Sequence, residues 1–178
     1  ARIMNRDIEV LNGYIHVLDK MLDPEIRSVW ELLQSNPRYS IFTAAVEKAG
    51  LQPILHRTGR LHTGGKSFVT AMVVPDEVFK KAGMNGVDDV VREYSPEKDN
   101  YTEVSNPFYK YMAYHILSGM QSYNDLVDFD KGKNVKNIET LAKNEMIMVE
   151  DVDNEVVINR DADLEQYVHL VDSAYNRQ

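Results

Sequence analysis

The sequence predicts an α+β fold, with helices in the first half of the chain and a β-rich second half. Apolar residues recur at helical spacing between Ser28 and Leu51. Beyond Asp130, short apolar runs are separated by turns rich in Asn, Asp and Gly, which is typical of strands. Helices followed by strands, rather than alternating with them, indicate an α+β fold.

The first element is a strand expected over residues 12–22, NGYIHVLDKML. Its side chains alternate between two faces, with Ile15 on one and His16 on the other. Asn12-Gly13 indicates a tight turn before it, because both residues tolerate positive φ. Pro24 then ends the segment. A buried strand that stops in this way usually closes a domain.

Helices are expected next, over residues 28–49 with a break at 36–40, and then over 75–82, 87–94 and 106–117. The apolar run at 67–74 predicts a buried strand that stops at Pro75. Residues 95–105 are polar and predict a loop. Strands are expected over 135–141, 145–150, 155–159 and 167–171.

Composition restricts the function classes. A chain of 178 residues can bury about 70% of its unfolded surface, enough for one full core. The net charge of −8 argues against a nucleic-acid partner, because such binding depends on Lys and Arg. Without cysteine the chain offers no thiolate nucleophile and no zinc–thiolate site. No apolar run approaches the roughly 20 residues of a transmembrane segment.

No catalytic residues and no cofactor are expected. The stretch RLHTGGKS at 60–67 ends like a phosphate-binding loop, but Arg60 stands where the first glycine is required. A strand rather than a helix is expected after it, so no helix N-terminus would face a phosphate. A hairpin tip at residues 63–65 is the better interpretation.

No metal site is expected either. His56 and His62 have no third ligand at a recognisable spacing. The pairs Asp128-x-Asp130 and Asp151-x-Asp153 begin like calcium loops, but neither continues to a closing Glu. Charged turns between strands explain these aspartates better.

Four motifs in combination resemble the fasciclin-like domains, which are repeats of cell-adhesion and matrix proteins and of bacterial surface proteins. They are Asn-Gly-x-Ile-His at 12–16, the helical stretch 28–51, FVTAMVVPDEVFKKAG at 68–83 and YKYMAYHILSG at 109–119. The resemblance implies a single fasciclin-like α+β domain.

The order of these motifs suggests a chain cut out of phase with a tandem repeat. Residues 1–24 would be the closing strand segment of one repeat, and 25–178 a domain without its own closing strand. Asn5-Arg6 and Asn176-Arg177 match each other near the two ends. The N-terminal strand is expected to fill the vacant position, either in its own molecule or in a neighbour. Filling in a neighbour would be strand-swapped self-association.

The resemblance implies a non-catalytic adhesion or interaction module, extracellular or on the cell surface. The alternatives are a periplasmic location, or anchoring to the outer membrane as a lipoprotein through an upstream segment. The partner of the module would be a surface or matrix protein, or a glycan. In adhesive members, Tyr114-His115 and the stretch with Asn5, Asp7 and Ile8 match elements linked to integrin recognition. The structural alternative is that histidines in apolar surroundings, His115 and His16, are core residues satisfied by hydrogen bonds.

A second function class is a glycan- or small-ligand-binding module. Aromatic side chains beside the 95–105 loop would form its apolar platform: Tyr94, Tyr101, Phe108, Tyr109 and Tyr111. A tyrosine stripe at helical spacing is more often part of a core.

Overall fold

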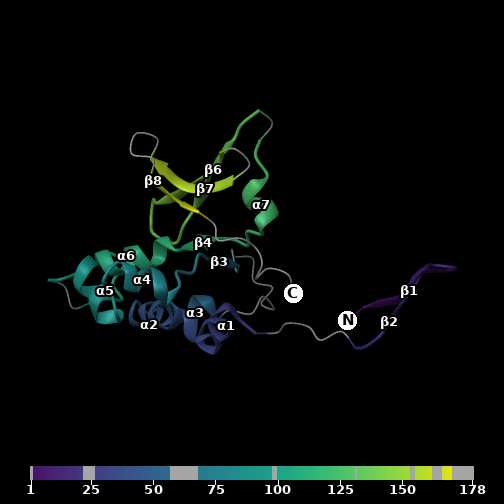
Figure 1. Cartoon of the computed structure of the whole chain (residues 1–178), viewed down its shortest axis with the longest axis horizontal. Helices are drawn as coiled ribbons and strands as arrows, with labels where there is room; N and C mark the ends of the chain where they lie inside the picture. Colours follow the sequence, from purple (N-terminus) through teal and green to yellow (C-terminus); the bar gives the residue numbers. More distant parts are fainter. Residues whose placement is uncertain are drawn as a thin grey trace.

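The computed structural model describes residues 2–21, 27–56, 68–97, 100–130, 132–152, 155–161 and 166–169. The α+β prediction is confirmed. Helices lie mostly in the first half, and the second half forms an antiparallel sheet (Figure 1).

The helices are α1 (Val29–Ser35), the 3-10 turn η1 (Pro37–Tyr39), α2 (Ser40–Lys48), α3 (Gln52–Leu55), α4 (Asp76–Lys81), α5 (Val87–Tyr94), α6 (Pro107–Tyr114) and α7 (Tyr123–Val127). Side chains fix several of their starts. Ser28 accepts a hydrogen bond from the Glu31 N–H at 3.2 Å, and Glu31 accepts one from the Ser28 N–H at 2.7 Å, a capping box at α1. Asn106 caps α6 through the Phe108 N–H.

The strands form three sheets. The strands are β1 (Ile3–Val10), β2 (Gly13–Leu18), β3 (Val69–Ala71), β4 (Ile116–Ser118), β5 (Val135–Glu139), β6 (Met146–Val152), β7 (Glu155–Asp161) and β8 (Gln166–His169). β1 pairs with β2, β3 with β4, and β5-β6-β7-β8 form one antiparallel sheet in that order. A single bridge between Leu117 and Thr140 connects β4 to the end of β5.

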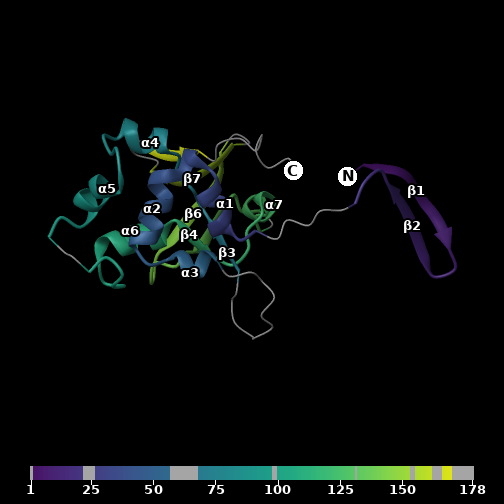
Figure 2. The same cartoon turned by 90° about the horizontal axis from the view of Figure 1, so that it is seen from below.

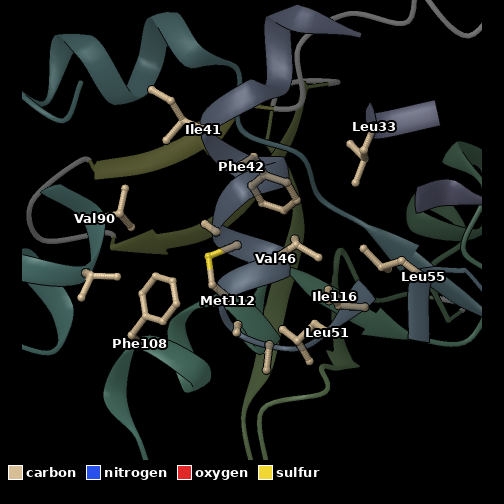
Figure 3. Packing of buried hydrophobic residues seen from close by; sticks show 14 of the residues in the cluster. Leu33, Ile41, Phe42, Val46, Leu51, Leu55, Val90, Phe108, Met112 and Ile116 are labelled. Carbon is tan, nitrogen blue, oxygen red and sulfur yellow. The ribbon is translucent and has the colours of Figure 1, made fainter. Parts of the chain in front are cut away.

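The larger core lies among the helices. Phe42 and Val46 of α2 face Met112 of α6 and Ile116 of β4, and all four are completely buried (Figure 3). Removing each such side chain from water contributes roughly 1.5–3 kcal/mol. This core holds α6 and β4 in place, and with them the Tyr-His element, which consists of Tyr114 and His115.

A second, smaller core lies under the sheet. It combines aliphatic residues of β4, α7, β5, β6 and β7: Leu117, Leu126, Ile138, Ile147, Val149, Val156 and Ile158. The partly buried Tyr114 packs against both cores. It therefore lies at the junction between the helical layer and the sheet.

Several elements differ from the sequence prediction. The helix expected over 106–117 ends at Tyr114, and residues 116–118 form β4 instead. The short helices α3 and α7 were not predicted. The strand expected over 67–74 is limited to Val69–Ala71, because its pairing with β4 covers only those residues.

The N-terminal strand does not occupy a position in the large sheet. β2 pairs with β1, and Figures 1 and 2 show this hairpin apart from the other elements. Its connection is the turn at Leu11-Asn12, since Val10 pairs with Gly13. Residues 2–17 are all exposed, so the expected burial of this strand is wrong.

Candidate functional site

The Tyr-His element lies where α6 passes into β4. Tyr114 is the last residue of α6, and His115 follows it as the C-cap. The His115 N–H bonds back to the Met112 carbonyl at 3.2 Å, while its own carbonyl accepts from the Met72 N–H at 2.8 Å. Both residues are half-buried. Backbone hydrogen bonds to Met112 and to Met72 therefore fix the position of the element.

Tyr114 joins α6 to the sheet. Its hydroxyl donates to the Met146 carbonyl at 3.1 Å and accepts from Asn159 Nδ2 at 2.8 Å. Asn159 Oδ1 in turn accepts from the Met148 N–H at 2.9 Å. Asn159 holds a left-handed conformation, with φ of 53°. The tyrosine hydroxyl therefore bridges β6 and β7, which is a structural task.

Sequence reasoning missed Asn159. The available signal was the triplet Asn159-Arg160-Asp161, which repeats Asn5-Arg6-Asp7. Tyr114 contacts the asparagine of the second triplet, whereas the prediction named only the first triplet, as a separate adhesion element.

His115 is half-buried, as its apolar neighbours indicated. Because a carbonyl only accepts, the 2.8 Å contact to the Tyr111 carbonyl makes Nδ1 the donor. The ring edge meets Phe42 at 5.9 Å and Tyr111 at 4.8 Å between centroids. Burial lowers the pKa of His115, and the hydrogen bond to Tyr111 only partly opposes it. The neutral ring is the folded form at neutral pH.

The lowered pKa of His115 predicts a pH dependence of stability. Its folded pKa lies below its unfolded value of about 6.5, so the unfolded chain binds the proton more readily. The contribution is complete above that value and is lost as the pH falls below it, until the folded pKa is reached. Urea unfolding between about pH 7.5 and pH 5.5 should show the loss.

The control for this measurement is His115→Asn, which keeps a donor for the Tyr111 carbonyl and removes the titrating ring. Its stability should fall less over the same pH range. Carboxylates with lowered pKa values, such as Glu31 held by the Ser28 N–H and hydroxyl, respond only at lower pH. Equal slopes for parent and variant would contradict the assignment.

The structure does not bring Asn5, Asp7 and Ile8 to Tyr114-His115. All three lie on β1 and are exposed. Asp7 has φ of 57°, and its N–H donates to His16 Nδ1 at 3.2 Å. His16 is therefore satisfied by a hydrogen bond but is not a core residue, since 46% of its side chain is exposed. The remaining motif residues, Asn12, Gly13 and Ile15, form the turn and β2.

One face of the hairpin is aliphatic. Ile8 pairs directly with Ile15, so the two side chains lie on the same face. Val17 lies on the same face, because it is two residues beyond Ile15 in β2. Val10, two residues beyond Ile8 in β1, also lies on this face and pairs with Gly13. Their exposures are 41% for Ile8, 50% for Ile15, 42% for Val17 and 39% for Val10. No other secondary-structure element among the described residues pairs with this ribbon.

A serine, a histidine and a glutamate also meet near α1. Ser28 Oγ lies 3.1 Å from His56 Nδ1 and 2.9 Å from Glu31 Oε2. The serine proton is directed to Glu31, and the hydroxyl is only the N-cap of α1. A catalytic triad needs the histidine between the serine and the acid. Here the serine lies between them, so the arrangement stabilises a helix.

The aromatic residues near the 95–105 loop contact one another. Tyr94 and Tyr111 stack at 3.7 Å, and Tyr101 meets the fully buried Phe108 edge-on at 5.8 Å. Burial and the neighbouring Tyr94 raise the pKa of Tyr111. Rings stacked on each other leave less open surface for a sugar, which favours the core interpretation.

Other predicted positions are only partly described. His62, Asp153 and the Gly-Lys-Ser stretch lie outside the described residues. Within the described part, no three His, Asp or Glu side chains group closely enough to hold a metal ion. None of the helices in that part combines the length and apolar character needed to cross a bilayer. No protein-family model matches the chain.

Proposed function

We propose that this chain is a non-catalytic interaction module of an extracellular or cell-surface protein, and that the β1–β2 hairpin is its binding surface. The observation that carries the proposal is the aliphatic face of Ile8, Ile15 and Val17. Exposed apolar surface is unfavourable in water and typical of binding sites. A strand pair can also add its backbone edge to a partner's sheet.

The resemblance to fasciclin-like domains supports the same class of function. It rests on the four motifs and suggests a surface or matrix protein as partner. Tyr114 and His115 support the domain that displays the hairpin, because their side chains make hydrogen bonds to Tyr111, Met146 and Asn159 of the same domain.

The test compares the full chain with an Ile8→Thr/Ile15→Thr variant. Threonine keeps strand propensity while removing aliphatic surface. Binding to immobilised surface and matrix proteins should weaken about tenfold or more. The melting temperature should stay unchanged, because the hairpin residues are exposed.

The matched control is Val78→Thr, which removes a similarly exposed aliphatic group, 48% exposed, outside the hairpin. It should bind like the parent. Equal binding by the hairpin variant would refute the proposal. Binding on a glycan array that the Ile8→Thr/Ile15→Thr variant retains would favour the glycan-binding alternative.

A further inference from the structure

A β-bulge interrupts the pairing of β1 with β2. The register shifts between Asn5 and Ile8. Two residues of β1, Arg6 and Asp7, there lie opposite a single residue of β2, His16. Asp7 is in the left-handed conformation, with φ of 57°, which is uncommon for a residue other than glycine. The bulge takes the Asp7 N–H out of the strand pairing, and this group needs another partner.

The His16 ring is that partner. The Asp7 N–H donates to His16 Nδ1 at 3.2 Å, which requires an unprotonated Nδ1. The Asp7 carboxylate is also near, with Oδ1 4.0 Å from the same nitrogen. The other charged groups beside the ring belong to the hairpin as well. Arg6 Nε lies 3.9 Å from Asp7 Oδ2, and Glu9 pairs with Tyr14 on the face of His16. The neutral ring therefore stabilises the bulge.

The bulge decides which side chain lies opposite Val17 on the aliphatic face. With the bulge, that residue is the uncharged Asn5. If the pairing of Ile8 with Ile15 continued without a bulge, it would be Arg6, because each step along β1 would match one step along β2. A guanidinium would then lie on the aliphatic face. The bulge therefore keeps a positive charge off this surface.

A proton on the His16 ring favours the pairing without the bulge. The protonated ring has an N–H group at both nitrogens and cannot accept from the Asp7 N–H. Without the bulge, Asp7 would lie directly opposite His16, where its carboxylate and the charged ring attract each other across the strands. No described element outside the hairpin pairs with it, and register is weakly specified in such a ribbon. A single contact is therefore enough to select one of the two pairings.

We propose that His16 and Asp7 form a pH-sensitive register switch in the hairpin. While the ring is neutral, the bulge keeps the aliphatic face uncharged and able to bind. When the ring is protonated, the first part of β1 shifts by one position against β2, and Arg6 enters that face. The two pairings differ in their contacts to the ring, so protonation shifts their populations. The consequence for binding rests on the proposed function, whereas the switch itself is measurable without a partner.

NMR of the full chain measures the register directly. Val17 should contact Asn5 across the strands when the bulge is present, and Arg6 when it is absent. The ratio of the second contact to the first should rise about fivefold or more from about pH 7.5 to about pH 5.5, where histidines take up a proton. An unchanged ratio would overturn the proposal. Loss of both contacts in acid would also overturn it, because the hairpin would then open instead of shifting register.

Two variants fix the two states. His16→Asn places an acceptor oxygen near the position of Nδ1 and does not titrate, so Val17 should contact Asn5 at both pH values. His16→Lys carries a positive charge and no acceptor, so Val17 should contact Arg6 at both. The melting temperature should stay that of the parent, because the hairpin residues are exposed. The proposal fails if either variant shows the pH response of the parent, or if His16→Lys loses both contacts.

Binding at pH 7.5 separates the switch from the proposed function. His16→Lys should bind immobilised surface and matrix proteins about tenfold more weakly than the parent, and adding Arg6→Thr should restore binding. Arg6→Thr alone is the matched control and should bind like the parent, because Arg6 lies opposite His16 in the bulged pairing.

Two outcomes distinguish the failures. If His16→Lys binds like the parent while Ile8→Thr/Ile15→Thr loses binding, the proposed function stands and the switch is rejected. A register that responds to pH in a chain that binds none of these proteins would support the switch and refute the proposed function.

Discussion

Asp76→Ala is expected to lower the free energy of unfolding by about 2–3 kcal/mol. Asp76 is the first residue of α4 and is buried. Its Oδ1 accepts from the Ile41 N–H at 2.9 Å, and its Oδ2 from Ser40 Oγ at 2.5 Å. The N-cap position of α2, Tyr39, provides no side-chain acceptor. Asp76 therefore caps α2 from another helix, and alanine would leave a buried N–H without a partner.

Two variants separate this cap from a general charge effect. Asp76→Asn keeps one acceptor oxygen and should lose less stability than Asp76→Ala. Glu77→Gln removes the neighbouring ion pair with the Arg38 guanidinium, which is exposed to solvent, and should change stability little. Urea unfolding at pH 7 measures all three. An alanine variant as stable as Glu77→Gln would show that the cap is not important.

This cap illustrates what the sequence could show and what it could not. Local pattern predicted that Asp76 lies in the first turn of a helix after Pro75, and it does. Its role as the cap of α2 depends on the Ile41 N–H, which lies 35 residues away along the chain. No local spacing encodes such a contact.

The missed strand β4 has the same cause. Residues 109–117 are apolar at helical spacing throughout, so periodicity continues the helix. The helix ends because residues 116–118 pair with β3, about 47 residues earlier at Leu117 and Thr70. That pairing outweighs local propensity, and only tertiary structure reveals it.

The two histidines of the candidate site differ in burial for a related reason. His16 and His115 both stand among apolar neighbours, which predicted partial burial for each. His115 packs against Phe42 and Tyr111 of the helical layer, whereas His16 lies on a two-stranded ribbon that pairs with no other described element. Burial depends on what covers an element as well as on its own sequence.

Tyr114→Ala should have the second large effect, a loss of about 2–4 kcal/mol of unfolding free energy. The ring packs against both cores, so its removal leaves a cavity at their junction. It also leaves Asn159 Nδ2 without the hydroxyl that it contacts at 2.8 Å. Tyr114→Phe keeps the ring and removes only the hydroxyl, and should cost about 1–2 kcal/mol.

A double-mutant cycle isolates the hydrogen bond. Asn159→Gly removes the amide while tolerating the φ of 53° at that position. Combined with Tyr114→Phe, it should lose less than the sum of the two single changes, because both remove the same contact. Strict additivity would contradict the contact.

Since Tyr114 lies in an element that resembles an adhesion motif, adhesion assays on its variants need a measurement of stability beside them. If Tyr114→Ala loses binding in proportion to its unfolded fraction while Tyr114→Phe binds normally, the tyrosine supports the domain. If Tyr114→Phe loses binding with its stability nearly intact, the hydroxyl itself contacts the partner.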